Sequence, residues 1–239
     1  MTKARRNIQK KGRKGDPIRE MAVERAYMYL HEKAVGFEFR PGERIKEADI
    51  AGILKISRGP VREALTRLAM NELVVLEAGK GFFSRKLSIK EVMELLELRT
   101  DLETCAVRGA IKNAQDGEIE SVRASWLAIV AKQNTLELGT LVNCDENFHI
   151  QIGELAGNSE RVRSMRNINE RIRFIRGIHL EDERSRAVIM GDHAGLIEAI
   201  ARRDTERAME LLESHIQYRA ADFQAFFHKG LIRIYGGDS

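Results

Sequence analysis

The sequence predicts a mainly α-helical protein in two folded parts: a small N-terminal domain that ends in a β-hairpin, and a larger all-α domain. Apolar residues recur every three to four positions along most of the 239 residues, as they do on one face of an α-helix. This period changes only between residues 73 and 85, where two short β-type runs flank a glycine-rich turn. The chain length favours two domains with separate cores, and no run of ~18 apolar residues predicts a membrane span.

Residues 1–15 form a basic segment that we expect to be a disordered arm. The segment has seven Lys and Arg residues and no acid, so the net charge of +4 leaves −3 on the rest of the chain. Such an arm is attracted to polyanions such as nucleic acid. A solubilising tail is an equally good interpretation, so the arm by itself predicts no partner.

Residues 16–87 have the pattern of a winged helix-turn-helix domain. Asp16 is a suitable N-cap for a helix that starts at Pro17, and Ser57 is a suitable N-cap for a later one. The expected elements are three helices and the two strands of a hairpin, at about residues 17–35, 45–54, 57–69, 73–76 and 82–85. Three helices followed by a hairpin indicate a DNA-binding domain in which the hairpin is the wing.

The remaining chain is expected to form an antiparallel helical bundle over residues 88–230, followed by a flexible tail at 231–239. Breaks at Gly, Asn and acidic residues separate six amphipathic stretches, at about 88–113, 116–133, 139–156, 159–180, 183–202 and 204–229. Their short connections favour antiparallel neighbours.

Two arginines mark the third helix as a DNA-recognition helix. Arg58 and Arg62 are four residues apart at its start, while Val61, Leu65 and Leu68 face inward. Arginine is the residue that most often bonds guanine edges in the major groove. The residues expected to contact phosphates are Lys55, Ser57, Arg67, Lys80, Arg85 and Lys86. A charged solvent face is the alternative, and the order of helices, basic turn and wing argues against it.

This domain resembles the DNA-binding motif of the GntR family of bacterial transcription regulators. The resemblance is carried by Pro41–Arg44, Ala51, Leu54, Ser57–Leu65 and Leu68, and it extends through the wing to Gly81. It implies that Arg44, Gly59 and Gly81 also belong to the DNA-binding surface.

Two residues depart from the family pattern. Lys55 occupies a turn position where the family usually has Gly, which predicts a strained left-handed backbone. Ala48 stands where some members use an Arg on DNA, so that contact is not expected here.

Four residues of the second domain are candidate metal ligands. Asp145 and His149 are four residues apart and therefore project from one face of a helix, where they can bind one cation. A solvated helical hydrogen bond is the commoner explanation for such a pair. His193 and His215 lie beside apolar positions and should point into the bundle. Three histidines and an aspartate converging there favour a divalent cation.

This region resembles the FCD ligand-binding domain, which follows the winged helix in one GntR subfamily. The match covers most of residues 88–228 and includes Asp145, Phe148, His149, Asn158, His193–Asp204, Ala208 and His215. It implies that Asp145, His149, His193 and His215 hold Zn²⁺, Ni²⁺ or a similar ion, with open positions for water or an effector carboxylate.

Arg99 has two interpretations of about equal weight. The resemblance places an Arg of the first bundle helix near the metal pocket, where it could bind an effector carboxylate with both nitrogens. The spacing equally predicts an ion pair with Glu103, four residues later.

Together these patterns predict a homodimeric, cytoplasmic transcriptional regulator that binds a pseudo-palindromic operator and responds to a small organic acid. The absence of an apolar signal segment and the two distant cysteines, Cys105 and Cys144, favour a cytoplasmic protein with reduced thiols. A regulator for which the metal is the signal is one alternative. A metal-dependent hydrolase is another, but no general base lies beside the expected ligands, so we expect no enzyme.

Overall fold

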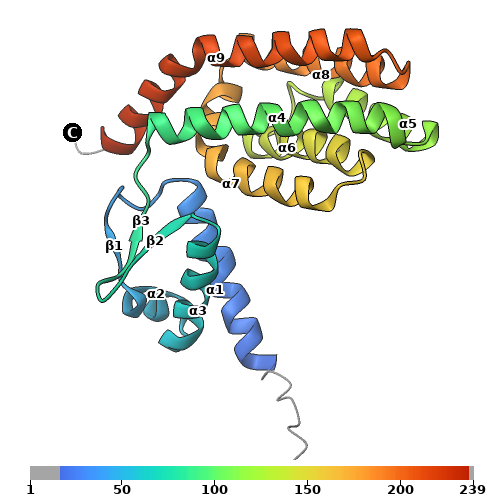
Figure 1. Cartoon of the computed structure of the whole chain (residues 1–239). Helices are drawn as coiled ribbons and strands as arrows, with labels where there is room; N and C mark the ends of the chain where they lie inside the picture. The colour runs from blue at the N-terminus through green and yellow to red at the C-terminus, as the bar shows by residue number, and fades with distance from the viewer. Residues whose placement is uncertain (1–16, 237–239) are drawn as a thin grey trace, which may run out of the picture.

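The computed structural model describes residues 17–236, except for the side chains of residues 216–224. It confirms a mainly α-helical fold with a small antiparallel sheet. The elements of the described chain are α1 (Pro17–Val35), β1 (Arg44–Ile45), α2 (Glu47–Leu54), α3 (Arg58–Met70), β2 (Val74–Glu77), β3 (Gly81–Ser84), α4 (Ile89–Asn113), α5 (Asp116–Val130), α6 (Leu138–Leu155), α7 (Ser159–Glu181), α8 (Glu183–Ala201) and α9 (Thr205–Tyr235). The winged helix forms the lower part of Figure 1 and the helices α4 to α9 form the upper part.

The winged-helix domain is built around α1 and α3, whose apolar faces pack against each other, and α3 also packs against β2. Leu30 of α1, Leu65 and Leu68 of α3, and Phe82 of β3 are buried in one core. The sheet has the strand order β1-β3-β2 and is antiparallel throughout. The sequence did not predict β1, because two residues are too few to show the alternation of a strand.

Lys55 adopts the strained conformation that the sequence predicts. It ends α2 in the left-handed region, with φ 53° and ψ 46°. A non-glycine residue in this region costs about 1 kcal/mol. The turn between α2 and α3 is therefore held by the packing on both sides of it.

In the second domain, α5 packs against α8 and α4 against α6, around a core that contains Trp126. Its indole Nε1 donates a hydrogen bond to the carbonyl oxygen of Met190, at 3.3 Å. A second apolar cluster joins α4, α7 and the end of α9, and includes Leu95, Ile172 and Phe227. No helix of the described chain combines the length and apolar character needed to cross a membrane.

The last helix is longer than the sequence predicts. We expected a flexible tail from residue 231, but α9 continues to Tyr235. Its end is held to α7 because Arg233 donates two hydrogen bonds to the carboxylate of Glu181, at 2.6 and 2.8 Å. The expected basic arm, residues 1–15, lies outside the described residues, as do residues 237–239 of the tail.

Candidate functional site

The start of α3 presents an exposed basic face. Arg58 and Arg62 are exposed there, while Val61 and Leu65 are buried, as the helical spacing predicts. The two arginines line a surface cleft of about 390 Å³ together with β1, the start of α2 and the wing. Of the other residues predicted to bind DNA, this cleft includes Arg44 and Gly81.

Glu47 holds the guanidinium of Arg62 in this cleft. Arg62 Nε donates a hydrogen bond to Glu47 Oε1, at 3.1 Å. The bond uses one edge of the guanidinium and leaves the terminal nitrogens for another partner. The sequence does not identify Glu47 as part of this surface, because its contact with Arg62 depends on how α2 packs against α3.

The other predicted DNA-binding residues fall into two groups. Lys55, Ser57 and Gly59 are exposed at the turn that precedes or begins α3, although the Ser57 hydroxyl makes no capping hydrogen bond. Lys80 is exposed at the tip of the wing and pairs with Glu77 at 2.9 Å. Arg67 and Arg85 are not with them. Arg85 is only 7% exposed and its guanidinium lies over the ring of Phe37, 4.5 Å from the centroid, so it is not placed to contact a phosphate as predicted.

Arg67 lies on the side of α3 that faces α1. It pairs with Glu63 at 3.0 Å and with Glu24 of α1 at 3.8 Å. The structure therefore does not bring Arg67 together with Arg58 and Arg62.

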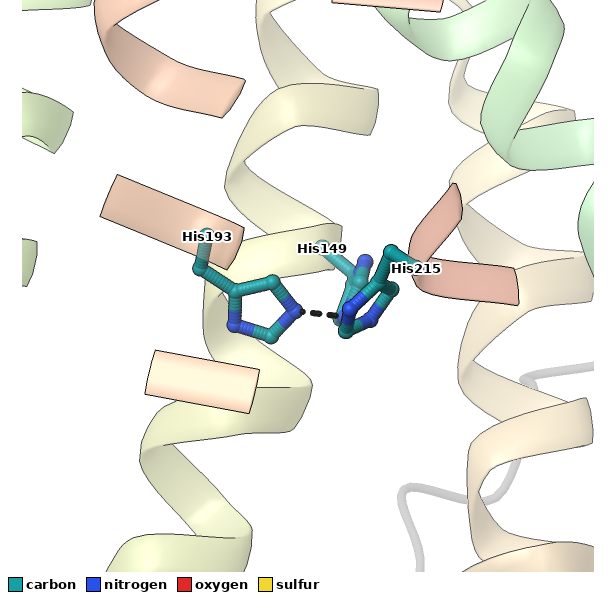
Figure 2. A group of neighbouring side chains, drawn as sticks. All are labelled: His149, His193 and His215. Atoms are coloured by element: carbon teal, nitrogen blue, oxygen red, sulfur yellow. Dashed lines mark hydrogen bonds between the residues drawn. The ribbon is translucent and has the colours of Figure 1, made fainter. Parts of the chain in front are cut away.

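Three histidines from three helices converge inside the second domain. His149 comes from α6, His193 from α8 and His215 from α9, and Figure 2 shows their rings pointing toward one another. One nitrogen from each ring lies within 4.8 Å of the other two. All three side chains are buried, with exposures of 2% or less. The sequence prediction that these histidines meet is confirmed.

Two of the three rings are oriented by carboxylates that contact their Nδ1 atoms. His149 Nδ1 lies 3.2 Å from Glu103 Oε2, and His215 Nδ1 lies 3.0 Å from Asp192 Oδ2. Each contact favours a ring with its proton on Nδ1 and a lone pair, rather than a proton, on Nε2. Histidines that bind metals are commonly oriented in this way.

Asp145, the fourth predicted ligand, lies beside the histidines but also contacts an arginine. Its Oδ1 is 3.7 Å from His193 Nδ1 and 3.9 Å from His149 Nε2. Its Oδ2 forms an ion pair with Arg176 of α7. Asp145 therefore faces the histidine cluster with one oxygen and α7 with the other.

This donor set suits a divalent ion of the zinc or nickel type. Imidazole nitrogen is a preferred ligand for both metals, and a carboxylate oxygen can complete the site. The buried position and the orienting carboxylates are the surroundings that such a site requires.

Arg99 satisfies one of its predicted roles and remains available for the other. Its Nε donates a hydrogen bond to Glu103 Oε1 at 2.5 Å. Its Nη1 and Nη2 are buried and have no hydrogen-bond partner among the described residues. They lie at a cavity of about 30 Å³, which Asp145 and Arg176 also line. The rest of its lining is largely apolar: Val92, Leu96, Ile172, Ile175, His179, Leu180, Ile189 and Phe226.

Glu146, the neighbour of Asp145, is directed away from the cluster toward Arg173 of α7. Burial raises the pKa of the Glu146 carboxyl to about 7, although Arg173 acts in the opposite direction. The two adjacent carboxylates thus belong to different surroundings.

Sequence reasoning missed two residues of this site. Asp192 directly precedes His193, a predicted ligand, and this position was a local signal that Asp192 could belong to the site. Arg176 occupies a position in the apolar stripe of α7, between Ile172 and His179, and a charged residue in such a stripe is the available signal. Neither signal reveals which partner the side chain contacts.

Comparisons with known proteins match both parts of the chain. The family model for bacterial regulatory proteins of the gntR family matches residues 22–83, and the model for the FCD domain matches residues 94–218. The Nta operon transcriptional regulator of Aminobacter aminovorans is 36% identical over 206 residues, which cover 86% of this chain and 96% of that protein. The transcriptional repressor RspR of Escherichia coli K12 is 24% identical over 195 residues, which cover 80% and 84%.

Known structures with the same fold include E. coli McbR/YncC. It matches with a TM-score of 0.69 and 19% identity, over 88% of this chain and 99% of that chain. A structure described as a transcriptional regulator GntR from Rhodococcus sp. RHA1 matches with a TM-score of 0.68 and 23% identity, over 86% and 98%. At these identities the likeness concerns the fold.

Proposed function

The chain belongs to the GntR family of bacterial transcriptional regulators, with an FCD domain after its DNA-binding domain, and we propose that a small carboxylate bound at a metal site in the FCD domain modulates its affinity for an operator. Family membership favours a regulator over an enzyme. The finer proposal depends on the surroundings of the histidine cluster.

The observation that carries this proposal is the position of the cluster beside a cavity with two arginines. His149, His193 and His215 offer ring nitrogens to a cation, and Arg99 and Arg176 line the neighbouring cavity. Asp145 connects the two sites, because it lines the cavity and lies within 4 Å of two of the histidine rings, so a carboxylate bound there would meet a guanidinium close to a cation held by the histidines. Both partners stabilise negative charge in a site from which water is largely excluded.

Helix α7 offers a physical route from this cavity to the winged helix. On its inner face, Ile172, Ile175 and Arg176 line the cavity. On its other face, Arg171 and Phe174 contact the DNA-binding domain. In Figure 1, α7 is the bundle helix nearest to that domain.

The contacts between α7 and the winged helix are polar and aromatic. Arg171 pairs with Glu72 at 2.6 Å and with Glu91, at the start of α4, at 2.7 Å. The ring centroids of Phe174 and Phe37 are 5.2 Å apart. Glu72 and Phe37 have positive φ values of 59° and 54°, so both contacts are made by strained turns of the winged-helix domain.

We further propose that the regulator acts as a homodimer on a pseudo-palindromic operator. Two-fold symmetry of a dimer would match two half-sites one helical turn apart. An effector that favours one arrangement of the two DNA-binding domains would then change operator affinity, and it can do so only by its differential affinity for the two arrangements.

A second candidate function is a regulator for which the metal itself is the signal. The histidine cluster favours this candidate, because its three ring nitrogens could hold an ion without an effector carboxylate. The two functions differ in what a metal-loaded protein does when a small acid is added.

The experiment is a titration of operator DNA, identified by selection from genomic fragments, with protein that has been stripped of metal and then reloaded. For the proposed function, the loaded protein changes its operator affinity about 5- to 150-fold when the correct acid is added, and the stripped protein does not. An affinity that changes with metal alone supports the metal-sensing candidate. An acid response that is unchanged after stripping contradicts both.

A further inference from the structure

Asp145 lies between the histidine cluster and Arg176 and contacts both. The Arg176 guanidinium contacts Asp145 Oδ2, and both side chains are more than nine-tenths buried. The other oxygen of Asp145 lies within 4 Å of two histidine rings. The same carboxylate is therefore within reach of a guanidinium and of the place where a cation would sit.

Electrostatics makes these two partners competitors. A buried carboxylate needs a positive partner, because the loss of its hydration is otherwise costly. Arg176 supplies this positive charge by its direct contact with Asp145 Oδ2. A divalent ion held by the histidines would supply a second source of positive charge to Asp145, which would then depend less on Arg176.

If Arg176 no longer paired with Asp145, its guanidinium could bind another anion in the cavity that it lines. Arg176 lines the same cavity as Arg99. Arg99 Nη1 and Nη2 and Arg176 Nη1 are buried without hydrogen-bond partners among the described residues. Two guanidinium groups with spare donors in a largely apolar cavity match a carboxylate, which accepts paired hydrogen bonds in its plane.

We propose that Arg176 exchanges partners: it pairs with Asp145 when no metal is bound, and it turns with Arg99 to a ligand carboxylate when a divalent ion takes Asp145. This inference rests on the proposed metal and effector site. It makes metal and carboxylate binding mutually reinforcing, because each favours the same position of Arg176. The ligand it fits is a small carboxylate with an apolar remainder.

Metal affinity in the absence of any carboxylate gives a direct test. The full chain, stripped of metal, is titrated with Ni²⁺ in a chloride buffer by calorimetry. Arg176→Met is expected to bind Ni²⁺ about tenfold more tightly than the wild type, because Asp145 no longer has to release a guanidinium. Arg173→Met is the matched control, because it removes a charge from the same helix but pairs with Glu146 and not with Asp145, and it should bind Ni²⁺ like the wild type.

A double-mutant cycle separates this effect from a structural one. In an Asp145→Asn background, the gain from Arg176→Met should disappear, whereas a general loosening of the bundle would act in both backgrounds. If the Arg176→Met variant does not fold, Arg176→Gln replaces it in the same Ni²⁺ titrations. Acetate, used as the probe carboxylate at constant ionic strength, should raise Ni²⁺ affinity in the wild type more than in the Arg176 variant.

The outcomes distinguish this inference from the function on which it rests. A wild type that binds Ni²⁺, together with an Arg176 variant of equal or weaker affinity, overturns the exchange and leaves the metal site intact. A wild type that does not bind Ni²⁺ overturns the metal site and the exchange with it.

Discussion

The Nε2 atoms of His193 and His215 lie 3.2 Å apart in the core of the second domain, although the residues are separated by 22 positions in the chain. They meet because α8 and α9 pack against each other and turn these two positions inward. Two imidazole nitrogens this close cannot both carry a proton on the line between them. Either one proton lies between the two nitrogens, as in a hydrogen bond, or both nitrogens bind a cation. His149 beside them supplies a third nitrogen for a cation.

Asp192 is predicted to support metal binding without contacting the ion. Asp192→Asn removes the charge behind the His215 ring, at Nδ1, and keeps the shape of the side chain. We expect metal affinity to fall about 10- to 100-fold, as is typical when an orienting carboxylate is lost. Calorimetric Ni²⁺ titration measures this. Glu183→Gln, on the same helix and exposed, is the control, and equal affinities of the two variants would contradict the role.

Arg62 and Lys80 are predicted to contribute differently to DNA binding. Arg62→Ala should cost about 1–3 kcal/mol on the operator and little on random DNA, because it removes a contact to a base edge. Lys80→Ala should weaken both equally and reduce the slope of affinity against salt by about one counterion. Fluorescence anisotropy at several salt concentrations measures both effects. Retained sequence preference in the Arg62 variant would contradict its assignment to the recognition helix.

Arg171 is predicted to transmit the effector response. Arg171→Ala breaks the ion pairs to Glu72 and Glu91, so the acid should still bind but should change operator affinity less than in the wild type. Arg166→Ala is a matched control, because Arg166 lies on the same helix but pairs with Glu154 of α6 on the exposed surface of the bundle. Parallel titrations of acid and operator measure the coupling. A full response in the Arg171 variant would show that α7 transmits it by other contacts.

Glu181 is predicted to stabilise the end of α9 in a pH-dependent way. Hydrogen bonds from Arg233 hold the pKa of the Glu181 carboxyl below its ordinary value. The folded state therefore favours the ionised form, so the stabilisation is present above the ordinary carboxyl pKa and is lost as the pH falls through the lowered value. Glu181→Gln should lower the free energy of unfolding by about 0.5–1 kcal/mol at pH 7.

The check is urea unfolding of wild type and variant at pH 7 and near pH 3. The difference between them should shrink at the lower pH, where a larger fraction of the wild-type carboxyl is protonated. A difference that does not depend on pH would mean that the variant acts through packing.

The features that the sequence predicts correctly are local or repeated along the chain. Helical period and turn residues locate the helices, and the change of period between residues 73 and 85 locates the wing. The inward direction of His193 and His215 follows from the apolar residues beside them. The left-handed backbone of Lys55 follows from the family pattern at that turn.

What the sequence does not reveal depends on contacts between distant segments. Arg176 and Asp145 are on different helices, and no local pattern pairs them. The Arg62 bond to Glu47 depends on how α2 packs on α3. Near the end of α9, Arg233 likewise bonds Glu181, which lies far away in the chain. Arg99 shows the limit most clearly, because its spacing predicts the bond to Glu103 but not that two nitrogens remain for the cavity.

The most direct test of the central claim is elemental analysis of the purified wild type and of the double variant His193→Ala/His215→Ala, both exposed to equal Zn²⁺ and Ni²⁺ and then dialysed. The account predicts about one bound ion per chain in the wild type and almost none in the double variant, because two of the ring nitrogens are lost. Undiminished metal in the double variant would contradict the account, because the ligands would then lie elsewhere in the chain.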